Sequence, residues 1–118
     1  KTRGFKRALL DQIHEALVEA IEIPADDRTQ RLYELAPDRF EFPEHRRDDL
    51  ILIEITMFKG RSTEAKRLLF RRIAERLAEK PGIDPRNVAV VLHEPPLENW
   101  GFGGVAASDT DLGFKVEV

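Results

Sequence analysis

The chain contains no cysteine. This absence excludes disulfides, thiolate nucleophiles and zinc–thiolate centres, and it leaves the cellular compartment undetermined by redox chemistry. Long hydrophobic runs are missing too, because no apolar stretch approaches the roughly 20 residues of a membrane span. No signal-peptide pattern opens the sequence either. We therefore expect a cytoplasmic protein that makes no membrane contact.

Clustered positive charge is scarce as well. The net charge is −3 with 35% charged residues, which fits ordinary solubility but not a phosphate-binding face, so we expect no nucleic-acid partner. His45 and His93 lack acidic or histidine neighbours at metal-ligand spacing. We expect neither a metal nor another cofactor, and we place His14 on the polar face of a helix.

The chain has the length of one domain. Its 118 residues can bury a core of their own, so we treat 1–118 as a single domain. Apolar residues at helical spacing predict a helix over residues 3–21, ended by "IPADD". Alternation in "RTQRLYEL", residues 28–35, predicts an imperfect strand. The charged stretch 36–49 contains prolines and predicts a loop, with at most a short extended piece at 40–42.

The second half has the same order of elements. "LILIEITMF", residues 50–58, is almost continuously apolar and predicts a strand covered on both faces. Ser62 can cap a helix that "KPG" ends after Glu79. "NVAVVLHE", residues 87–94, predicts another strand, and "PPLENWGFGG" a loop. The alternating end "SDTDLGFKVEV" predicts a short strand that could cross to a neighbouring subunit.

The two halves also share residues when position n is set against n + 60. The identical pairs are Lys6/Lys66, Arg7/Arg67, Leu9/Leu69, Ile13/Ile73, Glu15/Glu75, Leu17/Leu77, Glu19/Glu79, Ile23/Ile83 and Glu34/Glu94. This predicts an internal repeat of 1–35 and 61–95, each half a β-α-β unit. Two such units give an α+β fold, with a four-stranded mixed sheet and two helices on one face.

The repeat makes a further prediction about the start of the sequence. The strand at 50–58 and Gly60 would map just ahead of Lys1, so the first unit lacks its leading strand in these 118 residues. We expect that strand to precede Lys1 in the protein; a strand supplied by another subunit is the alternative.

Three stretches together resemble the tautomerase superfamily, and within it the branch of malonate semialdehyde decarboxylase. They are "RALLDQIHEALVEAIEIPADDRTQ", "DDLILIEITMFKGRSTEAKRLLFRRIAERL" and "ENWGFGG". The resemblance implies the fold above, a homotrimer, and active sites near subunit boundaries. It also implies a catalytic amino-terminal proline, whose amine acts as base or acid. The prolines of this sequence are internal amides without a basic nitrogen, so the proline is expected upstream of Lys1.

The resemblance also implies roles for charged residues. Asp27 matches an acidic residue that orders water or the proline amine, although aspartate is also common in turns for local hydrogen bonding. Arg61 matches an arginine that grips a substrate carboxylate, with a solvated residue at a helix start as the alternative. Lys59 stands where the decarboxylase has a second arginine, so the charge is kept but the bidentate fork is lost.

Trp100 and Phe102 match an aromatic pair that walls the pocket, in a glycine-rich loop able to approach a ligand closely. Ordinary packing at a subunit interface is the alternative. The sequence thus predicts a cofactor-independent enzyme for a small carboxylate substrate. Keto–enol tautomerisation is the first choice of reaction, and decarboxylation or hydration the second. The competing hypothesis is a trimeric pseudoenzyme or small-ligand binding module that lacks the proline.

Overall fold

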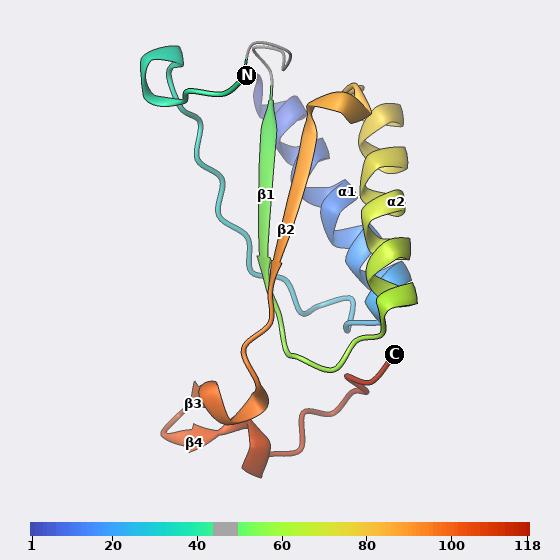
Figure 1. Ribbon diagram of the computed structural model, residues 1–118, viewed down its shortest axis with the longest axis vertical. Helices are drawn as coiled ribbons and strands as arrows, with labels where there is room; N and C mark the ends of the chain where they lie inside the picture. The colour runs from blue at the N-terminus through green and yellow to red at the C-terminus, as the bar shows by residue number, and fades with distance from the viewer. Residues whose placement is uncertain (44–49) are drawn as a thin grey trace.

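The computed structural model describes residues 1–43 and 50–118. Two long helices lie on one face of a pair of parallel strands (Figure 1). The first helix, α1, spans Arg3–Ile21, and the second, α2, spans Thr63–Glu79, in agreement with the predicted bounds. His45 and the rest of residues 44–49 lie outside the described residues.

The two helices begin with the same local structure. Thr2 and Ser62 have φ −72° and ψ 162°, and each side-chain oxygen accepts a hydrogen bond from a backbone N–H three residues on. Such a cap satisfies a helical N–H that has no partner within the helix. α1 ends where Glu22 adopts a left-handed conformation with φ 57°. Both helix starts are thus set by residues adjacent in the sequence.

The strand pair forms the second half's predicted β-α-β unit. β1, Ile51–Thr56, runs parallel to β2, Val88–His93, with Ile51 opposite Val88 and Thr56 opposite His93. Beyond β2 a short hairpin joins β3, Gly101–Phe102, to β4, Val105–Ala106. Short 3₁₀ turns cover Pro37–Arg39, Pro85–Asn87, Leu97–Asn99 and Ala107–Asp109.

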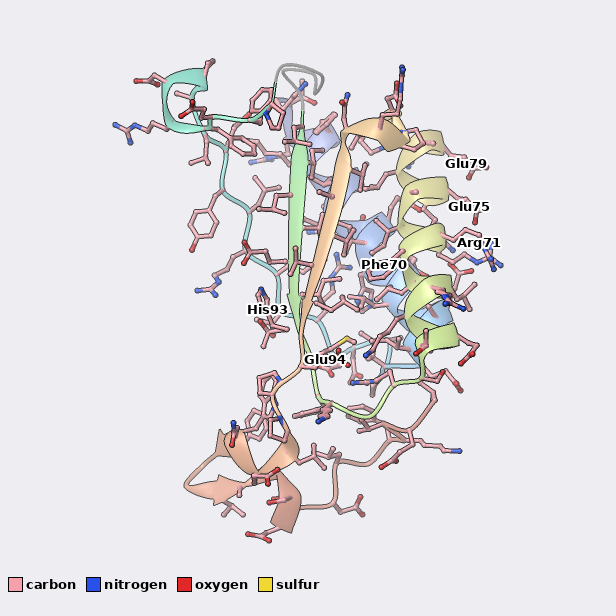
Figure 2. All side chains as sticks on the ribbon, in the orientation of Figure 1. Phe70, Arg71, Glu75, Glu79, His93 and Glu94 are labelled. Atoms are coloured by element: carbon pink, nitrogen blue, oxygen red, sulfur yellow. The ribbon has the colours of Figure 1, made fainter. Side chains whose placement is uncertain are left out.

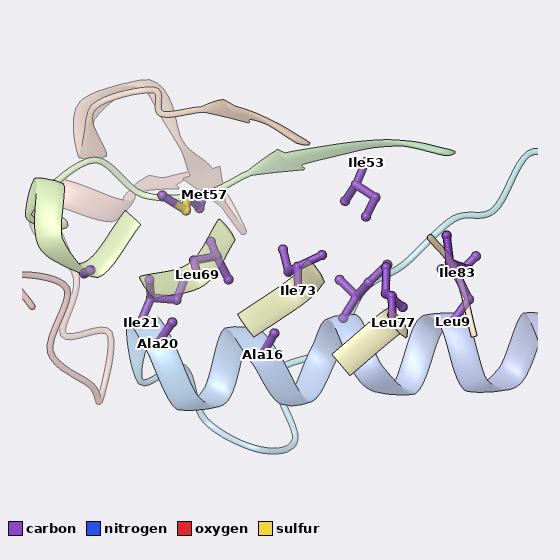
Figure 3. Packing of buried hydrophobic residues seen from close by; sticks show 12 residues of the cluster. Leu9, Ala16, Ala20, Ile21, Ile53, Met57, Leu69, Ile73, Leu77 and Ile83 are labelled. Atoms are coloured by element: carbon purple, nitrogen blue, oxygen red, sulfur yellow. The ribbon is translucent and has the colours of Figure 1, made fainter. Parts of the chain in front are cut away.

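The core lies between the helices and the inner face of the strand pair. Leu69, Ile73 and Leu77 are completely buried on α2 and pack toward Ala16 on α1 (Figure 3). Ile53 reaches this cluster from β1. The apolar residues that predicted the helices are therefore those that hold them to the sheet, as expected for amphipathic helices.

The outer face of the strand pair is open in the described residues. Leu52 is 48% exposed and Val91 is 43% exposed. They share this face with Glu54 and His93, whose Oε2 and Nε2 atoms are 3.5 Å apart. The prediction that β1 is covered on both faces is therefore wrong for the chain alone.

The predicted α+β class is confirmed, but one of the predicted strands is not formed. Residues 28–35 contain no strand, and β1 pairs only with β2 among the described residues. The segment runs past β1 without joining it (Figure 1). Tyr33 is 75% exposed and Leu35 is 52% exposed. A strand needs a hydrogen-bonding partner, and no neighbouring strand in 1–43 or 50–118 supplies one.

Equivalent ion pairs nevertheless occur within each of the two halves. Lys6 Nζ lies 3.0 Å from Glu34 Oε1, and Lys66 Nζ lies 2.8 Å from Glu94 Oε2. Each pair joins a helix to the segment that follows it. These contacts are what the predicted repeat of 1–35 and 61–95 would produce, and the repeat itself stays a prediction.

No helix among the described residues is both long and apolar enough to span a membrane. Within the same ranges, no group of three or more His, Asp or Glu side chains could hold a metal ion.

Candidate active site

Three segments meet beyond the carboxyl ends of β1 and β2. The turn 57–62 follows β1, the loop 94–102 follows β2, and residues 114–118 return to the start of α2 (Figure 1). The first two are joined by backbone hydrogen bonds from Met57 N to His93 O, 2.9 Å, and from Lys59 N to Pro95 O, 3.3 Å. Parallel strands bring their carboxyl ends to one edge, where α/β proteins commonly bind ligands.

Arg61 is the most enclosed charged residue of this region. It is only 6% exposed, and its Nη1 donates a hydrogen bond of 2.8 Å to the carbonyl of Phe58. Its Nε is buried without a hydrogen-bond partner among the described residues. Burial lowers the pKa of Arg61, while the nearby charges of Glu94, Asp27 and Glu117 oppose that shift. A buried guanidinium with a spare donor is suited to bind an anion.

Glu94 brings a carboxylate to the same place. It lies where the chain leaves β2 (Figure 2), and its Oε2 is bound by Lys66. Its Oε1 is buried with no partner in the described chain. The internal repeat pointed to Glu94 only as the counterpart of Glu34. The signal for a site residue was available, since a carboxylate directly after a parallel strand lies at the ligand-binding edge.

Aromatic rings form one side of the region. Trp100 donates from Nε1 to the carbonyl of Pro95, 3.1 Å, which fixes its ring. Its ring centroid lies 4.7 Å from that of Phe58 and 6.1 Å from that of Phe102, which stacks on it at 21°. Phe114 adds a fourth ring, 6.2 Å from Phe58. Trp100 and Phe102, which the sequence predicted as an aromatic pair, therefore pack with Phe58 and Phe114, which it did not predict.

Asp27 lies at the exposed end of a turn that α1 holds in place. Its backbone N–H donates to the carbonyl of Pro24, 3.0 Å, and His14 Nε2 contacts the carbonyl of Ala25 at 2.7 Å. His14 is 4% exposed, so the prediction that it lies on a polar face is wrong. Its burial is explained by this hydrogen bond, which ties the turn to the helix. Asp27 is close enough to Arg61 to favour its charge.

Lys59 is exposed, with its backbone held to Pro95. Arg61 and Lys59 therefore differ in environment although they are two residues apart. Lys59 can add positive charge at the exposed edge of the candidate site, whereas Arg61 is held in its interior.

The end of the chain takes a different course from the prediction. Residues 114–118 form no strand, and they pack on this chain instead of extending away from it. Val116 is 4% exposed, and Ser62 Oγ donates to the carbonyl of Val118, 2.9 Å. The apolar alternation that predicted a strand is used to bury Val116 against the turn before α2.

The chain matches the family model described as "Tautomerase enzyme" over residues 27–103. The curated relative "Probable tautomerase YusQ" of Bacillus subtilis is 36% identical over 96 residues, which cover 77% of this chain and 76% of that protein. "2-Hydroxymuconate tautomerase" of Comamonas testosteroni is 39% identical over 56 residues, which cover 48% of this chain but 89% of that protein. Nearly the full length of this second relative thus corresponds to half of the present chain.

A solved structure shows the same fold. The crystal structure of FG41 malonate semialdehyde decarboxylase inhibited by 3-bromopropiolate is 31% identical to this chain. The match has a TM-score of 0.81 and covers 92% of this chain and 86% of that one.

Proposed function

Because the chain belongs to the tautomerase family, we propose that it is a cofactor-independent tautomerase for a small 2-oxo or 3-oxo acid. One observation carries this proposal. Arg61 is 6% exposed, is held by the carbonyl of Phe58, and keeps Nε without a partner among the described residues. A carboxylate bound there would satisfy a buried donor that is otherwise costly.

In the proposed mechanism the proton is moved by an amino-terminal proline upstream of Lys1, the group that the family resemblance implies. Arg61 holds the substrate carboxylate, and with Lys59 it favours negative charge as the enolate develops. Asp27 orders the amine or a water molecule. Trp100 and Phe102 limit access of solvent to the reacting carbon.

Decarboxylation or hydration of a three-carbon oxo acid is the second candidate reaction. The similarity to the FG41 decarboxylase favours it. Lys59 is the residue that separates the two candidates, because a lysine cannot form the bidentate contact of a second arginine. Tautomerisation remains the first choice, because moving a proton between carbon and oxygen demands less of the site than breaking a carbon–carbon bond.

We also propose that three copies assemble into the homotrimer that the family resemblance implies. The outer face of β1 and β2 supports this, because Leu52 and Val91 are exposed there side by side with the Glu54–His93 pair. Exposed apolar residues on a sheet face are typical of association surfaces. Sedimentation of the purified protein measures the mass directly, and a monomer would contradict the trimer.

The decisive experiment determines the amino terminus and the activity of the same preparation. Intact mass and amino-terminal sequencing of the protein from its native gene are expected to find a proline-led extension before Lys1. Ketonisation of phenylpyruvate enol and of 2-hydroxymuconate is then followed by absorbance. Arg61→Ala should lower kcat/KM by about 100-fold, whereas Lys1→Ala, the equivalent position in the first half, should leave it unchanged.

The alternative is a pseudoenzyme or binding module without the proline. It would keep the charged pocket around Arg61 for binding and would lack the group that moves the proton. A mature protein that starts at Lys1 and does not turn over either enol, but still binds phenylpyruvate through Arg61, would support the alternative and exclude the enzyme.

A further inference from the structure

Residues 24–30, here called the Asp27 segment, are held against α1 by polar contacts on both sides of Asp27. Three hydrogen bonds join the segment to the helix: His14 Nε2 with Ala25 O (2.7 Å), Arg28 Nη2 with Asp11 Oδ1 (2.8 Å) and Gln30 Nε2 with Leu10 O (2.9 Å). Helix positions 10, 11 and 14 share one face, because residues three or four apart are neighbours on a helix. The course of the chain on either side of Asp27 is therefore set by one face of α1.

The contact made by His14 is the enclosed one of the three. His14 is 4% exposed, whereas the side chains of Arg28 and Asp11 are 31% and 41% exposed. Exposed ion pairs contribute little to stability, but loss of a buried hydrogen bond leaves a polar group without a partner. A carbonyl oxygen only accepts, so the Nε2 atom of His14 carries the proton and donates to Ala25. His14 is thus the main restraint on this turn.

The side chain of Asp27 is left free on the turn that His14 holds. The backbone N–H of Asp27 closes the turn by donating to the carbonyl of Pro24 at 3.0 Å. Aspartates in turns commonly accept a local hydrogen bond with their carboxylates. In residues 1–43 and 50–118, the Asp27 carboxylate accepts no hydrogen bond and forms no ion pair. The turn therefore places a carboxylate that remains available to a ligand or a water molecule.

The three contacts belong to the half of the chain that contains Asp27. The second half has different residues 60 positions further along: Ala74 for His14, Arg71 for Asp11 and Val90 for Gln30. There the chain after α2 passes through the turn Pro85–Asn87 directly into β2. The second half thus joins its helix to the following segment without a buried histidine. This difference favours a role for His14 in placing the Asp27 carboxylate.

We propose that His14 is a positioning residue, which holds the turn 24–27 against α1 and thereby fixes the Asp27 carboxylate in the candidate active site. This inference rests on the proposed function, in which Asp27 orders the amine or a water molecule. His14 acts through the turn and does not itself touch the substrate. Without its hydrogen bond the carboxylate is less often correctly placed, so the chemical step slows while binding at Arg61 is kept.

The kinetic test compares three substitutions of His14. His14→Gln keeps an N–H at nearly the reach of Nε2, whereas the side chain of His14→Asn is too short and that of His14→Leu has no donor. We expect the Asn and Leu variants to lower kcat for phenylpyruvate enol by about 10-fold with KM nearly unchanged, and the Gln variant to recover most of the loss. Glu15→Gln, at the adjacent exposed position, should match the parent protein.

Equal losses of kcat in His14→Gln and His14→Asn would overturn the proposal, because the donor would then not matter. If His14→Leu does not fold, the comparison of the Gln and Asn variants still decides the question.

A double-mutant cycle distinguishes positioning of Asp27 from a general effect on packing. If His14 acts through Asp27, His14→Asn should lower kcat in the parent protein but have almost no further effect in Asp27→Asn. The same fold loss in both backgrounds would show that His14 acts independently of Asp27, and it would overturn the proposal.

An exchange measurement without substrate separates this inference from the proposed function. The amide of Asp27 reports on the turn, because it donates to the Pro24 carbonyl. In His14→Asn this amide should exchange with solvent about 5- to 10-fold faster than in the parent protein, while the amides of α2 should not change. Unchanged exchange at Asp27 would overturn the proposal even if the protein is an active enzyme. Faster exchange in a protein that turns over neither enol would support the positioning by His14 and count against the proposed function.

Discussion

The two helix starts of this molecule share their local structure but differ in what lies over them. Thr2 and Ser62 cap the helices with the same backbone angles, and Lys6–Glu34 corresponds to Lys66–Glu94. Lys1 is exposed, whereas Arg61 at the equivalent position is 6% exposed. Among the described residues, the repeated local pattern therefore encloses the charged side chain at the helix start in the second half but not in the first.

The difference comes from segments distant in the sequence. The loop after β2 brings Trp100 against Phe58, and residues 114–118 bring Val116 against Gly60. No described segment returns to Lys1 in this way, and Glu34 stays 46% exposed compared with 21% for Glu94. Enclosure of a charge strengthens its interactions with a bound ligand, because water screens it less.

The largest expected difference between the halves is in the core. Leu69 is completely buried, while Leu9, its counterpart, is 8% exposed. Leu69→Ala should lower the free energy of unfolding by about 3–5 kcal/mol, and Leu9→Ala by about 2–3 kcal/mol. Urea unfolding followed by circular dichroism measures both. A larger loss for Leu9→Ala would show that the first helix, not the second, is the better packed.

The two helix caps should differ in their contribution to the free energy of unfolding by less than the two leucines do. Ser62 Oγ accepts from Ala65 N–H and donates to the carbonyl of Val118, whereas in ranges 1–43 and 50–118 the Thr2 oxygen shows only the hydrogen bond from Phe5 N–H. Ser62→Ala should therefore cost about 2 kcal/mol and Thr2→Ala about 1 kcal/mol. Chemical unfolding of the two variants provides the comparison. Equal losses would mean that the Val118 contact adds no stability.

The equivalent ion pairs provide a smaller contrast. Lys66→Met leaves a partly buried Glu94 without its cation, so it should cost about 1–2 kcal/mol. Lys6→Met removes an exposed contact and should cost less than about 1 kcal/mol. Unfolding measured at low and at high salt distinguishes the two ion pairs. Salt should screen the exposed pair and remove most of its contribution to stability, whereas the enclosed pair should keep most of its own. Identical salt sensitivity would contradict the difference in enclosure.

The smallest effect concerns acid stability and belongs to the first half alone. Hydrogen bonds from Arg7 and then Arg28 lower the pKa of Asp11 from 3.8 to about 2. The folded state thus favours the charged form, so this stability is present above about pH 4 and is lost as the pH falls toward 2. The second half has Arg71 at the equivalent position and no such pair.

Asp11→Asn should therefore flatten the decline in urea midpoint between pH 4 and pH 3 slightly, and Arg71→Gln should not. A variant Asp11→Asn with the parent's pH dependence would remove Asp11 from the acid response.

The sequence predicted the parts of this protein that depend on neighbours along the chain. Helix bounds followed from Ser62, the apolar periodicity and the helix-ending turns, because caps and periodicity are local. The strand at 28–35 was predicted wrongly, because a strand needs a partner that these 118 residues do not place beside it. His14 was misplaced for a similar reason, since its hydrogen bond to Ala25 depends on how the following turn folds back.

The sequence by itself therefore determined the two helices and the β1–β2 unit. Its family resemblance predicts the site residues Asp27, Lys59, Arg61, Trp100 and Phe102. Only the tertiary structure decided that Arg61 is buried and Lys59 exposed, that Phe58 and Phe114 join the aromatic wall, and that Glu94 and Glu117 lie near the guanidinium. Burial depends on which distant segments return to a residue. Local sequence patterns do not predict which distant segments will pack there, because the packing of the whole core decides it.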